Sequence, residues 1–182
     1  MGLGWSRFIG QDPKCSARLV PPNTLVVRSG DAAAAAYPVP GRVMYHPPVM
    51  KDKETRVDFD IAMRRIYAVR GGGVIIHELA SLTDPDNCEA GLNRVLYEGA
   101  ELGIPMIYCT QEPVRIYTKF FSQATVVVVF YLVPEHRGYL ARMCGAPAIN
   151  QPIPLDHTYG VWHRSRPEEF IRMPALPLGR AA

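Results

Sequence analysis

The sequence predicts an α/β fold, a three-layer αβα arrangement around a mostly parallel sheet, from two apolar runs and the helix between them. Residues 74–76 and 106–109 are short apolar runs that end abruptly in polar residues, as buried parallel strands do. The segment between them has helical periodicity, so the three pieces form a strand–helix–strand crossover. The carboxyl ends of both strands then meet at one edge of the sheet, where a functional site is expected.

The N-terminal part is expected to supply further strands. Residues 1–23 contain three prolines and little periodicity, which predicts an irregular N-terminal arm. Residues 24–28 and 42–45 are predicted strands, and the alanines at 32–36 a short helical turn between them. Asp58 is the expected N-cap of a helix whose apolar residues recur with the 3.6-residue period.

That helix is expected to end at three glycines, residues 71–73, which lead into the strand at 74–76. A phosphate-binding loop must instead follow a strand and open a helix, so the glycines are interpreted as a connection. The next helix is expected to begin with Asp84 as its cap and Pro85 in its first turn, and to stop at Gly103.

The C-terminal part continues the pattern. Residues 124–132 are the most β-prone run and a predicted core strand, followed by a helix over 135–144. A hairpin is expected between residues 159–163 and 170–173. The predicted organisation is therefore an arm (1–23), one α/β domain (24–173) and a disordered tail (174–182).

Composition narrows the class of protein. The 182 residues are 48% hydrophobic with a net charge of +3, which suits a globular domain and gives too little charge to argue for nucleic acid by itself. The four cysteines show no CxxC or Cys/His ligand spacing, and no apolar run is long enough to span a bilayer. A cytoplasmic protein with reduced thiols and no metal site is expected.

The candidate site residues follow the two central strands. His77 and Glu78 come directly after the first, and Thr110 and Gln111 after the second. Strand ends of this kind also make ordinary capping contacts, and that interpretation stays open beside the functional one.

The order and spacing of several strings resemble the second half of the FtsK/HerA group of P-loop ATPases, over about residues 42–173. The strings are Gly-Leu-Asn-Arg-Val-Leu-Tyr-Glu-Gly-Ala-Glu-Leu-Gly-Ile-Pro (91–105), Cys-Thr-Gln-Glu-Pro (109–113), Phe-Ser-Gln-Ala-Thr (121–125) and Phe-Tyr-Leu (130–132) before a helix ending at Gly145. The resemblance implies a RecA-like ATPase core, ATP and Mg²⁺ as cofactors, and a role in DNA translocation or phage DNA packaging or export. It also implies related ATPase subunits as oligomer partners, DNA as a possible partner, and the cytoplasm of a bacterium or a phage-infected host.

The resemblance assigns roles to the candidate residues. The strand ending at Glu78 is similar to the Walker B strand, so Glu78 would polarise the attacking water and His77 would stand in the position of the residue that holds the magnesium-bound water. Thr110 and Gln111 match the sensor that reports on the γ-phosphate. Glu78 and Gln111 are therefore the predicted catalytic residues, and His77 and Thr110 the predicted cofactor-binding residues.

The chain departs from the family pattern at most other positions. No GxxxxGK[ST] occurs, His77 replaces the magnesium aspartate, and Ala100 and Glu112 stand where arginines are usual. Phosphoryl transfer needs phosphate-cradling amides, a lysine and an arginine, so the domain is expected to be incomplete or degenerate, with weak ATP binding and no hydrolysis alone. With the P-loop strand missing, residues 105–109 and 127–130 are predicted to pair directly, the alternatives being an inserted N-terminal arm or another chain.

A second function class stays open. A helix ending in Glu-Leu-Gly-Ile-Pro (101–105) before a strand also resembles isochorismatase-like hydrolases, with Cys109 as the candidate nucleophile. A P-loop encoded upstream of Met1 would favour the motor, whereas hydrolysis lost in Cys109→Ala would favour the hydrolase.

Overall fold

The computed structural model describes residues 7–11, 24–37, 41–45, 52–70, 72–156 and 158–175. The chain forms two compact units, residues 1–111 with 115–117 and residues 112–114 with 118–182. Parallel strands alternate with helices in the first unit, which confirms the predicted α/β class. The predicted single domain, residues 24–173, spans both units, and its boundaries stay a prediction.

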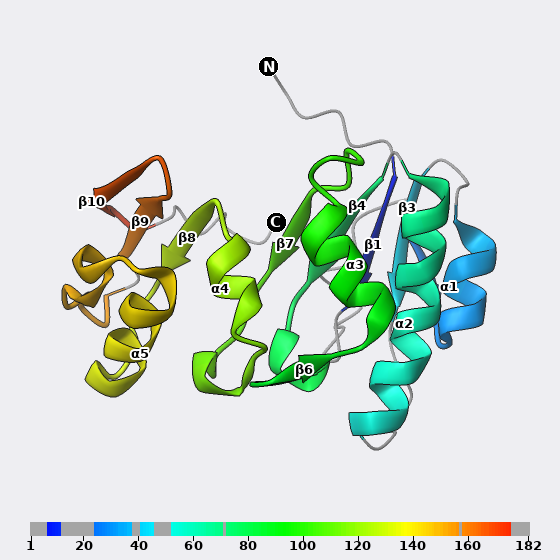
Figure 1. Cartoon of the computed structure of the whole chain (residues 1–182), viewed down its shortest axis with the longest axis horizontal. Coiled ribbons are helices and arrows are strands. Elements are labelled where there is room, and N and C mark those ends of the chain that lie inside the picture. The colour runs from blue at the N-terminus through cyan, green and yellow to red at the C-terminus, as the bar shows by residue number, and fades with distance from the viewer. Residues whose placement is uncertain are drawn as a thin grey trace, which may run out of the picture. The chain divides into compact units, whose positions relative to one another are not determined.

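The first unit is built on a five-stranded sheet whose order is β2-β3-β1-β4-β7 (Figure 1). Every neighbouring pair in it is parallel. The strands are β1 (Arg7–Gln11), β2 (Thr24–Val27), β3 (Gly41–Tyr45), β4 (Gly73–Ile76) and β7 (Met106–Tyr108).

Three helices lie on one face of this sheet, α1 (Gly30–Ala36), α2 (Asp52–Val69) and α3 (Ala90–Glu98) (Figure 1). The apolar stripe of α2 is fully buried, with Phe59, Ala62, Met63 and Ile66 at 1% exposure or less. The ring of Tyr45 at the end of β3 packs on Phe59, with 5.4 Å between the ring centroids. Burial of this stripe against the sheet holds α2 in place.

Two carboxylates of α2 bind the first turns of the helices on either side. Asp58 Oδ2 accepts hydrogen bonds from the backbone N–H of Gly30 (2.8 Å) and from the Tyr45 hydroxyl (2.7 Å). Asp60 Oδ1 accepts from the backbone N–H of Leu92 (3.0 Å). The prediction that Asp58 caps its own helix is therefore wrong, because α2 begins six residues earlier and Asp58 binds the start of α1 instead.

Two other predictions for this unit are corrected. Residues 1–23 were expected to be irregular, but Arg7–Gln11 forms β1 and pairs with β3 and β4 in the middle of the sheet. Asp84 was expected to cap a helix, but it ends β5 (Thr83–Asp84), which pairs with β6 (Asn87–Cys88). The intervening Pro-Asp makes the turn of this small hairpin, and α3 begins only after it.

The second unit contains a three-stranded antiparallel sheet in the order β10-β9-β8. Trp162 on β9, Val129 on β8 and Leu140 and Ile149 beside them are buried. The predicted hairpin is confirmed as β9 with β10. The elements are α4 (Lys119–Gln123), β8 (Val126–Val129), α5 (Pro134–Cys144), β9 (Tyr159–His163) and β10 (Arg166–Met173).

The predicted pairing of residues 105–109 with 127–130 is wrong. β7 pairs with β4, and β8 pairs with β9 in the other sheet. The alternative of an N-terminal strand between them is also wrong, since β1 enters between β3 and β4.

Other expectations fall partly outside the described residues. Pro174 and Ala175 follow β10 without regular structure, and residues 176–182 of the predicted tail lie outside the described part, as do Cys15 and His46. None of the described helices is both long and apolar enough to cross a membrane.

Candidate functional site

The structure brings Glu78 and Thr110 together at the carboxyl ends of β4 and β7. The Thr110 hydroxyl donates a hydrogen bond to Glu78 Oε1 across 3.1 Å. The same carboxylate oxygen accepts from the backbone N–H of Ala80 at 3.3 Å, so Glu78 is the N-cap of the 3-10 turn Leu79–Ser81. One predicted catalytic residue and one predicted nucleotide-binding residue therefore share a contact.

Backbone hydrogen bonds extend the β4–β7 ladder to this site. Cys109 N–H donates to the carbonyl of Ile76 (2.8 Å), and Leu79 N–H donates to the carbonyl of Cys109 (2.9 Å). Because these two bonds involve Ile76 and Leu79, on either side of Glu78 along the chain, the backbone that carries the carboxylate is tied to the end of the sheet. The position of Glu78 is set by regular parallel pairing.

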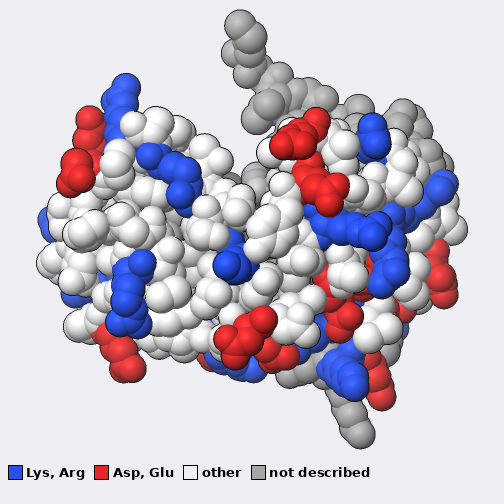
Figure 2. Space-filling view, in the orientation of Figure 1, with Lys and Arg blue, Asp and Glu red and all other residues white. Residues whose placement is uncertain are grey.

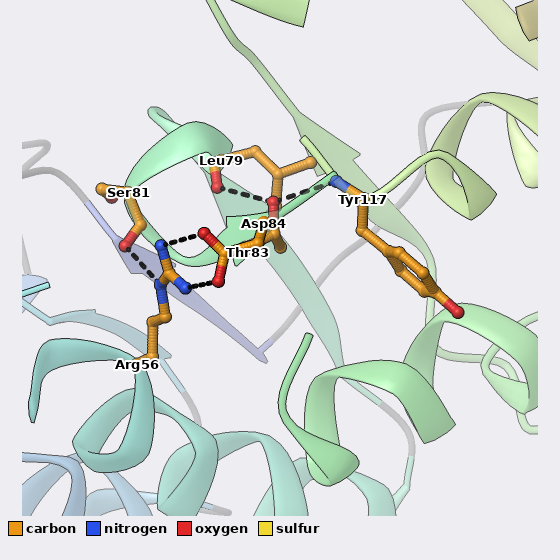
Figure 3. A network of polar contacts seen from close by, with 6 residues as sticks. All are labelled: Arg56, Leu79, Ser81, Thr83, Asp84 and Tyr117. Carbon is orange, nitrogen blue, oxygen red and sulfur yellow. Dashed lines mark hydrogen bonds and ion pairs between the residues drawn. The ribbon is translucent and has the colours of Figure 1, made fainter. Parts of the chain in front are cut away.

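A buried threonine anchors the turn that Glu78 opens (Figure 3). Thr83 is 1% exposed, and its hydroxyl donates to the carbonyl of Leu79 (3.4 Å) and accepts from the backbone N–H of Tyr117 (3.1 Å). The Ser81 hydroxyl donates a hydrogen bond to the carbonyl of Glu78 across 2.8 Å. These contacts fix the segment after β4 from both sides.

An arginine of α2 reaches the same turn (Figure 3). Arg56 Nε donates to the carbonyl of Ser81 (3.4 Å), and both of its terminal nitrogens bind the Asp84 carboxylate. The Arg56 side chain is only 15% exposed, whereas that of Asp84 is 59% exposed. The guanidinium hydrogen bonds hold the pKa of Asp84 below its usual value.

The other two predicted site residues take no part in the hydrogen bond between Glu78 and Thr110. His77 and Gln111 are both exposed, and neither forms a hydrogen bond or an ion pair with another described residue. Their side chains are therefore accessible from solvent at the same sheet edge. No group of three His, Cys, Asp or Glu side chains that could hold a metal ion exists among the described residues.

Cys109, the candidate nucleophile of the alternative function, is exposed beside this edge. Partial desolvation of its thiol, and then the negative charge of Glu78, raise the pKa of Cys109. A thiol whose pKa is raised carries less thiolate at neutral pH, and the thiolate is the nucleophile. The raised pKa therefore gives no support to catalysis by Cys109.

The residues present do not fit a complete site for ATP and Mg²⁺. The Glu78 carboxylate could face a magnesium-bound water, and the Thr110 hydroxyl a phosphate oxygen. The exposed imidazole of His77 is a nitrogen donor, which Mg²⁺ binds poorly. The sequence has no glycine loop with a lysine to cradle the phosphates, so no step of ATP hydrolysis is assigned to this chain alone.

The face of the protein drawn in Figure 2 shows no continuous basic surface that would bind a nucleic acid. Basic and acidic side chains lie side by side over the first unit in Figure 2. On α3, Arg94 lies over the ring of Tyr67, 5.6 Å from its centroid, and the Tyr67 hydroxyl is bound to Glu98. Mixed charge of this kind gives weak steering of a polyanion.

Sequence reasoning missed the residues that support the site. Arg56 and Thr83 come from segments with no recognisable motif, and only the folded chain brings them to the turn. The Asp84-Pro85-Asp86 stretch did carry a signal, since Pro and Asp are typical turn residues, but it was assigned to a helix start. The supporting contacts are tertiary, which explains why periodicity did not reveal them.

Comparison with known proteins gives a match in structure but none in sequence. No protein-family model and no curated protein sequence matches the chain. The genome packaging NTPase B204 of Sulfolobus turreted icosahedral virus 2, solved with ATP-gammaS, superposes with a TM-score of 0.67 at 11% identity, over 94% of this chain and 82% of that one. The DNA-packaging ATPase B204 of Sulfolobus turreted icosahedral virus gives a TM-score of 0.65 at 14% identity, over 93% and 82% of the two chains. At this identity the likeness shows a shared fold.

Proposed function

We propose that this chain is an NTPase-type domain of a DNA-translocating or genome-packaging motor that does not hydrolyse ATP by itself. The observation that carries the proposal is the fold shared with a DNA-packaging ATPase over 93% of the chain. The order of the motifs that resemble FtsK/HerA ATPases points to the same class.

The proposal gives the site residues distinct roles. In an assembly that supplies the missing phosphate-binding groups, Glu78 would orient the attacking water, because its carboxylate is held after β4 by the Ala80 amide and the Thr110 hydroxyl. Thr110 and Gln111 would contact the phosphate, and His77 would stand in place of the aspartate that holds the magnesium-bound water in the family. The B204 structures are described as complexes with ATP-gammaS, AMPPCP, AMP and sulfate, which supports a nucleotide site in this fold.

The chain is proposed to act together with related ATPase subunits and with DNA. The sequence contains no GxxxxGK[ST] motif, so we propose that other subunits supply the phosphate-cradling amides and the lysine that hydrolysis needs. A packaging ATPase in the infected host cytoplasm fits this arrangement.

Nucleotide titration followed by NMR tests the proposal. We expect ATP·Mg to bind with a Kd above about 1 mM, a binding free energy smaller than about 4 kcal/mol. The amide shifts should be confined to residues 77–81 and 109–111, and should be lost in Thr110→Val. Micromolar affinity, or shifts that avoid both segments, would contradict the proposal.

A control variant distinguishes loss of ATP·Mg binding in Thr110→Val from a general effect of replacing threonine by valine. Thr118→Val removes a hydroxyl that makes no side-chain capping bond at the start of α4. It should leave the amide shifts caused by ATP·Mg unchanged.

A further inference from the structure

The three-stranded sheet of the second unit ends in two edge strands, β10 and β8, that differ in their side chains (Figure 1). β10 carries the features that proteins place on an exposed edge: a proline, Pro167, a bulge between Arg166 and Phe170, and several charges. The charged residues are Arg166, Glu168, Glu169 and Arg172. These features prevent the open backbone groups of β10 from pairing with another chain.

β8 lacks a proline, a bulge and a charge. It consists of four consecutive valines, Val126–Val129, and residues 124–133 around it contain no charged side chain and no proline. It is also the last strand in the order β10-β9-β8, so one of its edges pairs with no strand in the described part of the chain. An uncharged edge of β-branched residues is the kind that accepts a further strand.

The ladder with β9 fixes which backbone groups of β8 point to the open edge. The two strands are antiparallel, with Val126 opposite His163. At the adjacent position of this register, the backbone N–H of Arg164 donates to the carbonyl of Thr125 across 2.9 Å. Hydrogen-bonded pairs alternate along an antiparallel ladder, so Val126 and Val128 point their N–H and C=O groups away from β9.

The same two valines present their side chains to solvent. Val126 and Val128 are 49% and 50% exposed, whereas Val129 is 2% exposed on the face that holds the buried Trp162. A strand added at this edge would gain backbone hydrogen bonds and contacts with two apolar side chains.

A second copy of β8 matches this edge. Around a two-fold axis perpendicular to the sheet, two copies of β8 lie antiparallel and their outward-pointing residues face each other. With the axis at Val128, that residue faces its own copy and Val126 faces the partner's Phe130. The Phe130 ring packs on Tyr159, 5.5 Å between centroids, and so continues the exposed face of the strand. Pairs of β-branched and aromatic residues stabilise a sheet, and no like charges meet in this arrangement.

We propose that two copies of this chain associate through β8, antiparallel about a two-fold axis, which joins their three-stranded sheets into one. The proposal does not depend on the function proposed above. A strand pair of this length is expected to bury less than the roughly 1,200 Å² of a standard interface, so the dimer forms only at high protein concentration.

Hydrogen exchange of the backbone amides tests the pairing in the unmodified full chain. The amides of Val126 and Val128 are bonded only in the dimer, whereas those of Val127 and Val129 face β9 in either state. Raising the protein concentration from about 20 µM to about 1 mM should slow exchange at Val126 and Val128 about threefold or more, and should not change it at Val127 and Val129.

Two outcomes of the exchange experiment would overturn the proposal. Rapid exchange of Val126 and Val128 at both concentrations would show an open edge. Equal protection of these two amides at both concentrations would show that a segment of the same chain, and not a second copy, covers β8.

A charge on the shared edge gives a second test. Val128→Lys places two like charges close together across the two-fold axis, so the variant should be monomeric in sedimentation equilibrium at the higher concentration. Ile171→Lys is the matched control, because Ile171 lies on the same face of the sheet but on β10, and is 52% exposed. It should dimerise like the wild type. Loss of the dimer in both variants would show that the whole sheet face forms the interface and would contradict pairing through the β8 edge.

A complementary charge distinguishes lost pairing from a damaged fold. Val128→Glu alone should also be monomeric, and an equimolar mixture of Val128→Lys and Val128→Glu should restore the dimer, because opposite charges then face each other. Both variants should keep the near-UV circular dichroism of the wild type. Folded variants that stay monomeric after mixing would overturn the two-fold pairing.

Discussion

The Thr110 hydroxyl lies 3.1 Å from the Glu78 carboxylate and bridges the carboxyl ends of β7 and β4. A hydrogen bond to a charged group is stronger than one between neutral groups. Thr110→Val should therefore lower the free energy of unfolding by about 1.5–3 kcal/mol, as measured by urea denaturation. Thr118→Val is the matched control and should change stability by less than about 0.5 kcal/mol. Equal losses in the two variants would mean that the Thr110–Glu78 contact contributes little.

The Thr83 hydroxyl gives the second prediction. It is buried, donates a hydrogen bond to the carbonyl of Leu79 and accepts one from the backbone N–H of Tyr117. Thr83→Val keeps the shape but removes both contacts, so we expect a loss of about 1–3 kcal/mol in unfolding free energy. Thr83→Ser keeps the hydroxyl and should retain most of the stability. Hydrogen exchange of the Tyr117 amide should accelerate in the valine variant only, and an unchanged exchange rate would contradict the assigned role.

Glycine packing between helices gives the third prediction. A Cβ on Gly30 would meet the Asp58 carbonyl oxygen at 1.7 Å, so α1 and α2 cannot keep their spacing in Gly30→Ala. We expect a loss of about 1–3 kcal/mol in thermal or urea unfolding, as for other overpacked sites. Gly138→Ala, in α5, is the counterpart, because a Cβ there would meet only Asn150 Oδ1, at 4.0 Å, outside the helix's own backbone. That variant should stabilise the protein by about 0.5–1 kcal/mol, and destabilisation there would show that the helix is not packed as described.

Some of these relationships could be predicted from the sequence and others could not. The strand–helix–strand unit around β4 and β7 was predicted because each apolar run is bounded by polar residues or glycine. Parallel pairing of these two adjacent strands explains why Glu78 and Thr110, which follow them, lie within hydrogen-bond distance.

The errors share a physical cause. β1 was missed because Arg7–Gln11 has no apolar run, and its place depends on pairing with β3 and β4. The apolar run at 124–132 does contain a strand, β8, but the predicted core strand is wrong: β8 covers only Val126–Val129, lies at the edge of its sheet beside β9, and leaves Val126 and Val128 about half exposed. β-propensity specifies neither the partner nor the burial of a strand. Local sequence thus identified elements better than it identified their neighbours.

The Arg56–Asp84 pair gives a pH prediction. The guanidinium lowers the folded-state pKa of Asp84 below the value of about 3.9 expected for the unfolded chain. The stabilisation is therefore present above the unfolded pKa and is lost as the pH falls through the folded-state pKa. Asp84→Asn should flatten the loss of stability below about pH 4, by a small amount because the carboxylate is largely exposed. Urea denaturation from neutral to acidic pH measures it, with Asp86→Asn as the control in the same turn. A parallel pH profile for Asp84→Asn and the wild type would contradict the pairing.

The thiol of Cys109 gives the last prediction, which also bears on the hydrolase alternative. Burial and the Glu78 carboxylate raise its pKa, so its thiolate fraction near neutral pH is below that of a free cysteine. Glu78→Gln removes the charge, lowers the pKa of Cys109 and should speed its alkylation by iodoacetamide, as followed by peptide mass spectrometry. Glu101→Gln, exposed after α3, should leave the rate unchanged. Rapid alkylation of wild-type Cys109 at neutral pH, unaffected by Glu78→Gln, would show an activated thiol. That result would support the alternative function, a hydrolase with Cys109 as its nucleophile.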